Sequence, residues 1–255
     1  SLITGINTLF NALLQQDDFV KLDFSKLKAT VGGGMAVQNP VAVAWEKITG
    51  CYLAQGYGLT ETSPTLSVNP IDGNGKLGSI GLPLPSTSMR IVDDNGKVLE
   101  PGEIGEIQAS GPQIMKGYYN QPEETAVSLK DGWFSTGDLG YMEPDGFFRI
   151  VDRKKDMIKT GGENVASREV EEMIYRLTAV SEVAVIGLPD PKWVEAVTAV
   201  IVVKQGLGLA KEEVIKHCQQ HMAGFKCPKR IIFTDVLPKK PSGKLLMREL
   251  RQRYA

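Results

Sequence analysis

Two short apolar stretches near the start of the chain run into glycines, and this arrangement restricts the fold more than any other feature. Lys28–Val31 reads as a strand that ends at Gly32–Gly34, and Cys51–Ala54 reads as a second strand that ends at Gly56–Gly58. The segment between them has apolar residues at helical spacing. Strands that alternate with helices and end in glycine turns are typical of an α/β sheet. We therefore expect residues 1–74 to form part of an α/β layer.

The pattern then changes, because glycine and proline recur between short β-like runs. Two of these runs, Gly137–Tyr141 and Phe147–Val151, flank a strong turn sequence at Glu143–Gly146 and predict a hairpin. Residues 75–152 are therefore predicted to form a β-rich subdomain.

A third pattern follows, in which helices and strands are mixed. Ser167 is the predicted N-cap of a helix whose apolar positions follow at i, i+3, i+4 and i+7. Strands are predicted at Val183–Leu188 and Ala196–Val203, and a final helix is predicted after Lys244. The expected fold class is thus α/β and α+β: a partial α/β sheet layer, a β-rich subdomain and a small α+β C-terminal domain over residues 153–255.

Composition excludes several classes of protein. The chain has 255 residues, of which 42% are hydrophobic and 23% charged, as expected for a globular protein with a sizeable core. A net charge of -1 disfavours a non-specific nucleic-acid binder. No apolar run reaches the ~18 residues of a membrane span, and the first residues lack the features of a signal peptide. Three scattered cysteines predict no disulfide framework and fit a reducing cytoplasm.

The glycine turns carry groups suited to a nucleotide. Gly33 and Gly34 let a ligand approach the backbone closely, although a tight turn explains them equally well. In the next turn, Tyr57 offers a ring face for a base, Thr60 a hydroxyl for a phosphate and Glu61 a hard carboxylate for Mg²⁺. A polar surface turn is the alternative, and three such groups within five residues weaken it.

Asp138 and two later segments indicate a functional site less strongly than these turns do. The Asp138 carboxylate can accept hydrogen bonds from both ribose hydroxyls, but an aspartate in an Asx turn is common. The charged run Asp152–Asp156 reads either as solvated surface or, since it separates two differently patterned regions, as a hinge. The pair Gly161–Gly162 is suited to lining a narrow tunnel that any side chain would block.

Two histidines and a cysteine on one predicted helix raise the question of a metal site. His217 and His221 share a face, but no acidic partner or CxxC pair stands at zinc spacing. Cys218 continues an apolar stripe, so a buried cysteine flanked by surface histidines is the favoured interpretation. The chain has only these two histidines, and no Ser-His-Asp or Cys-His constellation is indicated.

Six motifs occur in an order that resembles the adenylate-forming superfamily of acyl-CoA synthetases, adenylation domains and luciferases. They are Gly32–Met35, Gln55–Glu61, Ser135–Asp138, Val151–Lys159, Gly161–Asn164 and Pro241–Lys244. The resemblance covers essentially the whole chain. Asn7–Leu14 and Ser63–Pro70 look most like bacterial long-chain fatty-acid–CoA ligases. Such enzymes make an acyl-adenylate from a carboxylic acid and MgATP, and then transfer the acyl group to CoA after the small C-terminal domain rotates.

The resemblance implies a role for each matching residue. The implied catalytic residues are Lys244, Thr60 and Glu61. The implied role of Lys244 is to contact the carboxylate and α-phosphate oxygens. Thr60 would contact phosphate, and Glu61 would ligate Mg²⁺. The residues implied to bind ATP or AMP are Gly33, Gly34, Met35, Gln55, Gly56, Tyr57, Asp138 and Arg153, the last two through the ribose. In the C-terminal domain the implied residues are Lys155 as the hinge, Gly162 in the pantetheine tunnel of coenzyme A and Lys159 beside it.

One departure from the superfamily is serious. The Ser/Thr/Gly-rich loop that ends in lysine and grips the β- and γ-phosphates is absent, as is the whole N-terminal half. The 255 residues therefore resemble the C-terminal half of a ligase, and we expect them to be inactive alone.

Two alternatives stay open: a catalytically incomplete nucleotide- or CoA-binding module, and a ligase for a medium-chain or aryl acid. The expected location is cytoplasmic. Attachment at the inner membrane face and homo-oligomerisation through exposed sheet edges also stay open.

Overall fold

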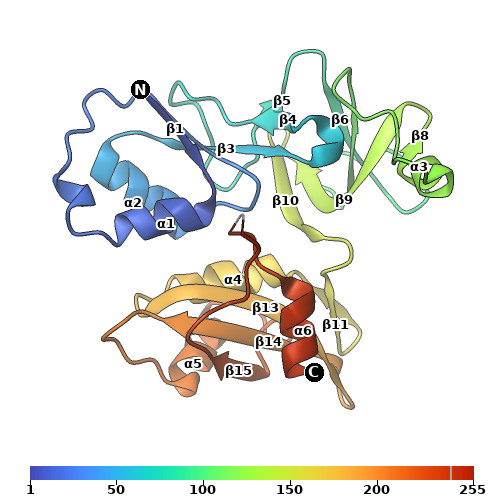
Figure 1. Cartoon of the computed structure of the whole chain (residues 1–255). Coiled ribbons are helices and arrows are strands. Elements are labelled where there is room, and N and C mark those ends of the chain that lie inside the picture. The colour runs from blue at the N-terminus through green and yellow to red at the C-terminus, as the bar shows by residue number, and fades with distance from the viewer. Residues whose placement is uncertain (242) are drawn as a thin grey trace. The chain divides into compact units, whose positions relative to one another are not determined.

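The computed structural model describes residues 1–241 and 243–255, and the chain divides into two compact units. The first unit comprises Ser1–Val151 and the second Asp152–Ala255. Within the described residues the strands form three five-stranded sheets (Figure 1). The combination of parallel and antiparallel sheets with helices confirms the α/β and α+β fold class expected from the sequence. Across the described ranges, every helix falls short of the length and apolar character that crossing a bilayer requires.

The first sheet holds the strands that carry the glycine turns. Its order is β1-β2-β3-β4-β5, parallel from β1 to β3 and antiparallel afterwards. The strands are β1 (Leu2–Gly5), β2 (Ala29–Gly32), β3 (Leu53–Gly58), β4 (Thr65–Val68) and β5 (Leu82–Pro83). The helical elements are α1 (Asn7–Leu14), η1 (Phe19–Lys21), α2 (Asn39–Thr49) and η2 (Thr60–Thr62). The rings of Phe10 on α1 and Trp45 on α2 meet edge to face at 4.9 Å, which joins the two helices.

The predicted end of the second strand at Ala54 is wrong. β3 continues through the glycine motif to Gly58, because Gly56 and Tyr57 pair with Val68 and Ser67 of the antiparallel strand β4. The pairing partner lies outside the local sequence pattern, so the glycines alone indicated a turn.

The second sheet forms the β-rich part of the first unit. Its order is β10-β9-β7-β6, and β8 pairs with the first residues of β9. The elements are β6 (Ser88–Val92), β7 (Gly105–Ser110), α3 (Pro122–Ser128), β8 (Leu129–Lys130), β9 (Trp133–Met142) and β10 (Phe148–Arg153). The predicted hairpin is confirmed: the Glu143 N–H donates to the Phe147 carbonyl at 2.7 Å, at the turn between β9 and β10.

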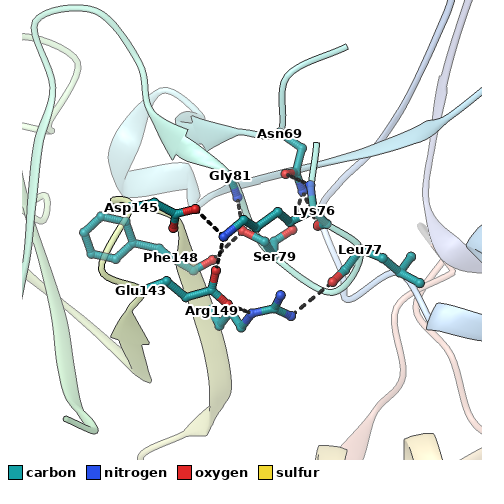
Figure 2. Close-up of polar contacts among 9 residues, drawn as sticks. All are labelled: Asn69, Lys76, Leu77, Ser79, Gly81, Glu143, Asp145, Phe148 and Arg149. Atoms are coloured by element: carbon teal, nitrogen blue, oxygen red, sulfur yellow. Dashed lines mark hydrogen bonds and ion pairs between the residues drawn. The ribbon is translucent and has the colours of Figure 1, made fainter. Parts of the chain in front are cut away.

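A polar cluster fastens the segment Asn69–Gly81 to this hairpin (Figure 2). Lys76 Nζ lies 2.6 Å from a carboxylate oxygen of Glu143. The Ser79 hydroxyl, fully buried, donates to the Phe148 carbonyl at 2.8 Å. Because buried polar groups without partners are costly, these bonds favour one arrangement of the segment against the hairpin.

The second unit is built on the third sheet, whose order is β12-β11-β14-β13 with β15 on β14. Its strands are β11 (Ile158–Thr160), β12 (Glu163–Val165), β13 (Val180–Asp190), β14 (Val194–Val203) and β15 (Arg230–Phe233). Its helices are α4 (Ser167–Tyr175), α5 (Lys211–His221) and α6 (Met247–Tyr254). β13 is buried on both faces: Val185 packs in one core cluster with Cys218 of α5, and Ile186 packs in another with Leu250 of α6. The predicted burial of Cys218 is thereby confirmed.

Ser167 is not the N-cap that the sequence predicted. It is the first helical residue of α4, and Ala166 occupies the N-cap position. The buried carboxylate of Asp152 takes over the capping task, because it accepts from the Ser167 N–H at 2.5 Å and from its hydroxyl at 2.8 Å. Burial raises the pKa of Asp152. The sequence pattern missed this cap because the acceptor lies 15 positions upstream.

Glu171 on α4 makes the stability of the second unit depend on pH. The residue keeps some exposed surface, but its carboxylate is enclosed and accepts the Val185 N–H at 2.9 Å. Burial raises the pKa of Glu171 from 4.5 to about 7, and nearby Asp152 adds to the effect. Between these two values the folded state holds a proton that the unfolded state has released. Stability therefore falls as pH rises through this window and levels off above it.

Glu171→Gln is expected to remove this dependence, because glutamine keeps the acceptor for Val185 without a charge. We expect its free energy of unfolding at pH 8 to exceed that of the wild type by about 1–3 kcal/mol, and to match it near pH 4. Urea unfolding between pH 4 and 8 measures both. Glu163→Gln, at an exposed position on β12, is the control and should keep the wild-type profile. An unchanged pH slope in Glu171→Gln would contradict the assignment.

Candidate functional site

Gly33, just after β2, lies beside Gly56 within β3. A Cβ atom placed on Gly33 would lie 3.3 Å from the carbonyl oxygen of Gly56, so a side chain at position 33 would crowd the backbone of β3. Gly34 has a φ of +76°, a conformation that favours glycine. Met35 follows and is partly buried. The structure thus brings these predicted residues together at the carboxyl ends of parallel strands, where ligands bind in open α/β sheets.

Gln55 and Tyr57 lie in β3 and are largely enclosed. Gln55 is 6% exposed, and its carbonyl accepts the Asn69 N–H at 2.9 Å. Tyr57 is 9% exposed, and its ring belongs to the core cluster between the first two sheets. Its hydroxyl donates to Asp138 Oδ2 at 2.7 Å. Only a small part of the Tyr57 ring is therefore open for stacking on a base.

The loop after β3 presents Thr60 and Glu61. Thr60 is exposed, Glu61 is partly exposed, and both lie in the 3₁₀ turn η2. The buried Thr62 closes this loop on itself: its hydroxyl accepts the Leu59 N–H at 2.9 Å and donates toward the Pro64 carbonyl at 2.5 Å. The closed loop holds a hydroxyl and a carboxylate at the surface next to the glycine turns.

Tyr118 is a contact of this loop that the sequence analysis missed. Its hydroxyl donates to Glu61 Oε1 at 3.1 Å, and the Met115 N–H donates to the Glu61 carbonyl at 2.8 Å. Burial, followed by the hydrogen bond to Glu61, raises the pKa of Tyr118, so the phenol keeps the proton that it donates. The two residues are 57 positions apart, and no local pattern around Tyr118 indicates its partner.

Asp138 lies on β9 at an irregularity in the pairing with β7. The preceding Gly137 has a φ of +72°. The Asp138 N–H donates to the Thr136 hydroxyl at 3.1 Å, and that hydroxyl in turn donates to the Ile107 carbonyl at 2.8 Å. These contacts place a carboxylate that is 5% exposed beside Tyr57. The structure therefore joins two of the predicted nucleotide residues within the first unit.

The remaining predicted residues belong to the second unit. The carbonyl of Arg153 accepts the Asp156 N–H at 2.9 Å, and this turn leaves Lys155 exposed. Lys159 on β11 is also exposed. Gly162 follows Gly161 in the turn between β11 and β12, where φ is +60° at the first glycine and +87° at the second. Among the described residues no atom lies within 4 Å of a Cβ placed on Gly162, and the positive φ favours glycine there.

Lys244 lies on the loop between β15 and α6, and the helix begins only at Met247. The Lys244 carbonyl accepts the Lys240 N–H at 2.8 Å, and Lys239 forms a bridge with Leu245. These backbone contacts place Lys239 and Lys240 beside Leu245 and Lys244. Ser242 of the same motif lies outside the described residues.

The donor set fits Mg²⁺ as an ion bound together with phosphate. Among the described residues, no group of three or more His, Cys, Asp or Glu side chains could hold a metal by itself. Mg²⁺ commonly takes one or two carboxylates and completes its shell with phosphate oxygens and water. The Glu61 carboxylate, with the Thr60 hydroxyl beside it, meets this requirement.

Comparison with known families accounts for both units. The model described as "AMP-binding enzyme" matches residues 1–119, and the model described as "AMP-binding enzyme C-terminal domain" matches residues 169–244. The chain belongs to the AMP-binding enzyme family. The resemblance to adenylate-forming enzymes predicted from the motifs is thereby confirmed.

Individual AMP-binding enzymes match over nearly the full chain. A long-chain-fatty-acid–CoA ligase of Yersinia pestis is 52% identical over 249 residues, which are 98% of this chain and 44% of the relative. A feruloyl-CoA synthase of Amycolatopsis sp. is 40% identical over the whole chain and 52% of its own length. The ATP-bound MatB of Rhodopseudomonas palustris superposes with a TM-score of 0.93 at 35% identity, over 100% of this chain and 51% of that one. The chain thus spans about half the length of these relatives.

Proposed function

We propose that the chain is the C-terminal part of a ligase that joins a long-chain fatty acid to coenzyme A and converts ATP to AMP and pyrophosphate. Sequence identity supports the long-chain substrate. The chain is 52% identical to the Yersinia ligase and 40% identical to the feruloyl-CoA synthase. The observation that supports the proposal is that the first unit brings candidate nucleotide residues together, since Gly33 lies beside Gly56 and Tyr57 donates to Asp138.

The proposed ligase contains three parts within this chain. Residues 1–74 belong to the α/β layer of the large domain, residues 75–152 form its β-rich subdomain, and residues 153–255 form the small mobile domain. The proposed location is cytoplasmic.

In the first half-reaction, a carboxylate oxygen of the fatty acid attacks the α-phosphorus of ATP, and the bond to the pyrophosphate oxygen breaks. Two anions approach each other, so positive charge must offset their repulsion. When bound, Mg²⁺ supplies part of that charge. Glu61 would hold the ion, Thr60 would bind a phosphate oxygen and Asp138 would bind the ribose hydroxyls. Gly33 and Gly56 would leave room for the adenine at the backbone.

Lys244 would supply the other positive charge in this step, from a loop on the second unit. In the second half-reaction the CoA thiol loses its proton and attacks the acyl carbon, and the bond to the AMP oxygen breaks. A lysine on a mobile domain can withdraw before that attack and leave space for the thiol. Lys155 lies in an exposed turn just after the boundary between the units, where a hinge would act.

The test is product formation by the full-length protein. With ATP, CoA and palmitate we expect release of AMP and formation of palmitoyl-CoA, at higher kcat/KM than with octanoate or ferulate. If the protein formed acyl-CoA from ferulate and not from palmitate, the proposed long-chain substrate would be wrong and an aryl acid would take its place. If the protein released no AMP with any of the three acids, the proposal that it is an AMP-forming ligase would be refuted.

The 255 residues by themselves are expected to show no ligase activity. They contain no Ser/Thr/Gly-rich phosphate loop, and without it the β- and γ-phosphates of ATP lack their main contacts. Acyl-CoA formation by the 255-residue polypeptide, measured beside the full-length protein at equal concentration, checks this. Turnover comparable to the full-length rate would contradict it.

A further inference from the structure

One hydrogen bond between buried side chains connects the first two sheets at the nucleotide surface. The Tyr57 hydroxyl on β3 donates to Asp138 Oδ2 on β9 at 2.7 Å. Tyr57 is 9% exposed and Asp138 is 5% exposed. The residues are 81 positions apart, so the contact is a product of the tertiary fold. A hydrogen bond of ordinary length between buried partners restricts both side chains.

The surroundings of each partner determine what this bond does. The Tyr57 ring packs in a core cluster with Leu66 and Phe148, so its hydroxyl has a defined position. The backbone N–H of Asp138 donates to the Thr136 hydroxyl, and its carboxylate accepts from the Tyr57 hydroxyl. A carboxylate offers about four lone-pair sites, and the single proton of the phenol occupies one of them. The bond therefore orients the Asp138 carboxylate and leaves it able to accept from further hydroxyls.

We propose that the Tyr57 hydroxyl is a positioning group for nucleotide selection, which orients the Asp138 carboxylate toward the ribose 2′- and 3′-hydroxyls. The inference rests on the ribose role proposed for Asp138 and gives Tyr57 a task that its ring cannot perform. Phenylalanine at this position keeps the ring in the core but removes the proton that the Asp138 carboxylate accepts from Tyr57. Ribose would then be distinguished less well from deoxyribose.

The experiment measures binding of AMP and 2′-deoxy-AMP to the full-length protein by calorimetry. The ratio of the two affinities isolates the contact of the 2′-hydroxyl. We expect Tyr57→Phe to lower the preference for AMP about 3- to 10-fold, because AMP loses two oriented hydroxyl contacts whereas 2′-deoxy-AMP loses only that of its 3′-hydroxyl. Asp138→Ala should lower the preference further. The double variant should lose no more than Asp138→Ala alone, because the hydroxyl acts only through that carboxylate.

The outcomes separate this inference from the proposals on which it rests. Equal weakening of both nucleotides in Tyr57→Phe would mean a purely structural bond and would overturn the inference. An unchanged ratio in Tyr57→Phe together with a lower ratio in Asp138→Ala would also overturn it, and would leave the ribose site intact. An unchanged ratio in Asp138→Ala would remove the ribose site and the inference with it. Calorimetry with AMP involves no acid substrate, so failure of the fatty-acid proposal is detected separately by the palmitate assay.

Discussion

Replacing Lys244 with alanine in the full-length protein is expected, on the proposed ligase function, to slow formation of the acyl-adenylate by about 100- to 1,000-fold, the usual effect of removing one group that stabilises charge in a transition state. The physical reason is the approach of two anions, the fatty-acid carboxylate and the α-phosphate. Lys244 is suited to offset their repulsion because it lies on a loop ahead of α6 rather than within the helix. Pyrophosphate release with ATP and palmitate measures the effect.

The second half-reaction provides the internal control. Thioester formation from supplied palmitoyl-adenylate and CoA should proceed in Lys244→Ala at close to the wild-type rate, since the lysine acts only on the first step. Lys240→Ala is the matched variant: it removes the same charge from an exposed position on the same loop and should leave both steps nearly unchanged. Equal loss of both half-reactions in Lys244→Ala, or equal effects of the two variants, would contradict the assigned role.

Local periodicity predicted most elements of the fold but not their non-local partners. The apolar runs at Val183–Leu188 and Ala196–Val203, which lie within β13 and β14, needed no knowledge of the rest of the chain. The continuation of β3 through Gly56 and Tyr57 depends on pairing with β4, which no property of the glycines reveals. The N-terminus of α4 likewise depends on Asp152, which lies before β11.

The candidate site shows the same division between chemistry and geometry. Residue types identified Tyr57, Glu61 and Asp138 as groups suited to a nucleotide and its metal, because a ring and two carboxylates are what such ligands require. The contacts that orient them come from far along the chain: Tyr57 binds Asp138, and Tyr118 binds Glu61. Sequence patterns describe neighbours along the chain, so they propose the functional groups without the partners that hold them.

Gly58→Ala is expected to lower the free energy of unfolding by about 3 kcal/mol, since it overpacks a site where backbone meets backbone. A Cβ atom at Gly58 would lie 1.7 Å from the Pro64 carbonyl oxygen, so the loop of Thr60–Thr62 could not close. The Thr62 hydroxyl bonds that close it would then be broken. Because the same loop carries Glu61, the full-length variant should also bind MgATP more weakly. Urea unfolding and calorimetry measure the two effects.

Gly50→Ala is the matched control in the same unit. Gly50 has a φ of +67°, and no atom of the described residues lies within 4 Å of its Cβ position, so alanine there is expected to meet backbone strain of about 1–2 kcal/mol. It lies at the end of α2, away from the loop, and should leave MgATP affinity unchanged. If Gly58→Ala cost no more stability than Gly50→Ala, or kept full MgATP affinity, close approach of the backbone would not be the reason for glycine at position 58. Glycine at this position would then be required for its backbone flexibility and not for the space that lets the loop close and present Glu61.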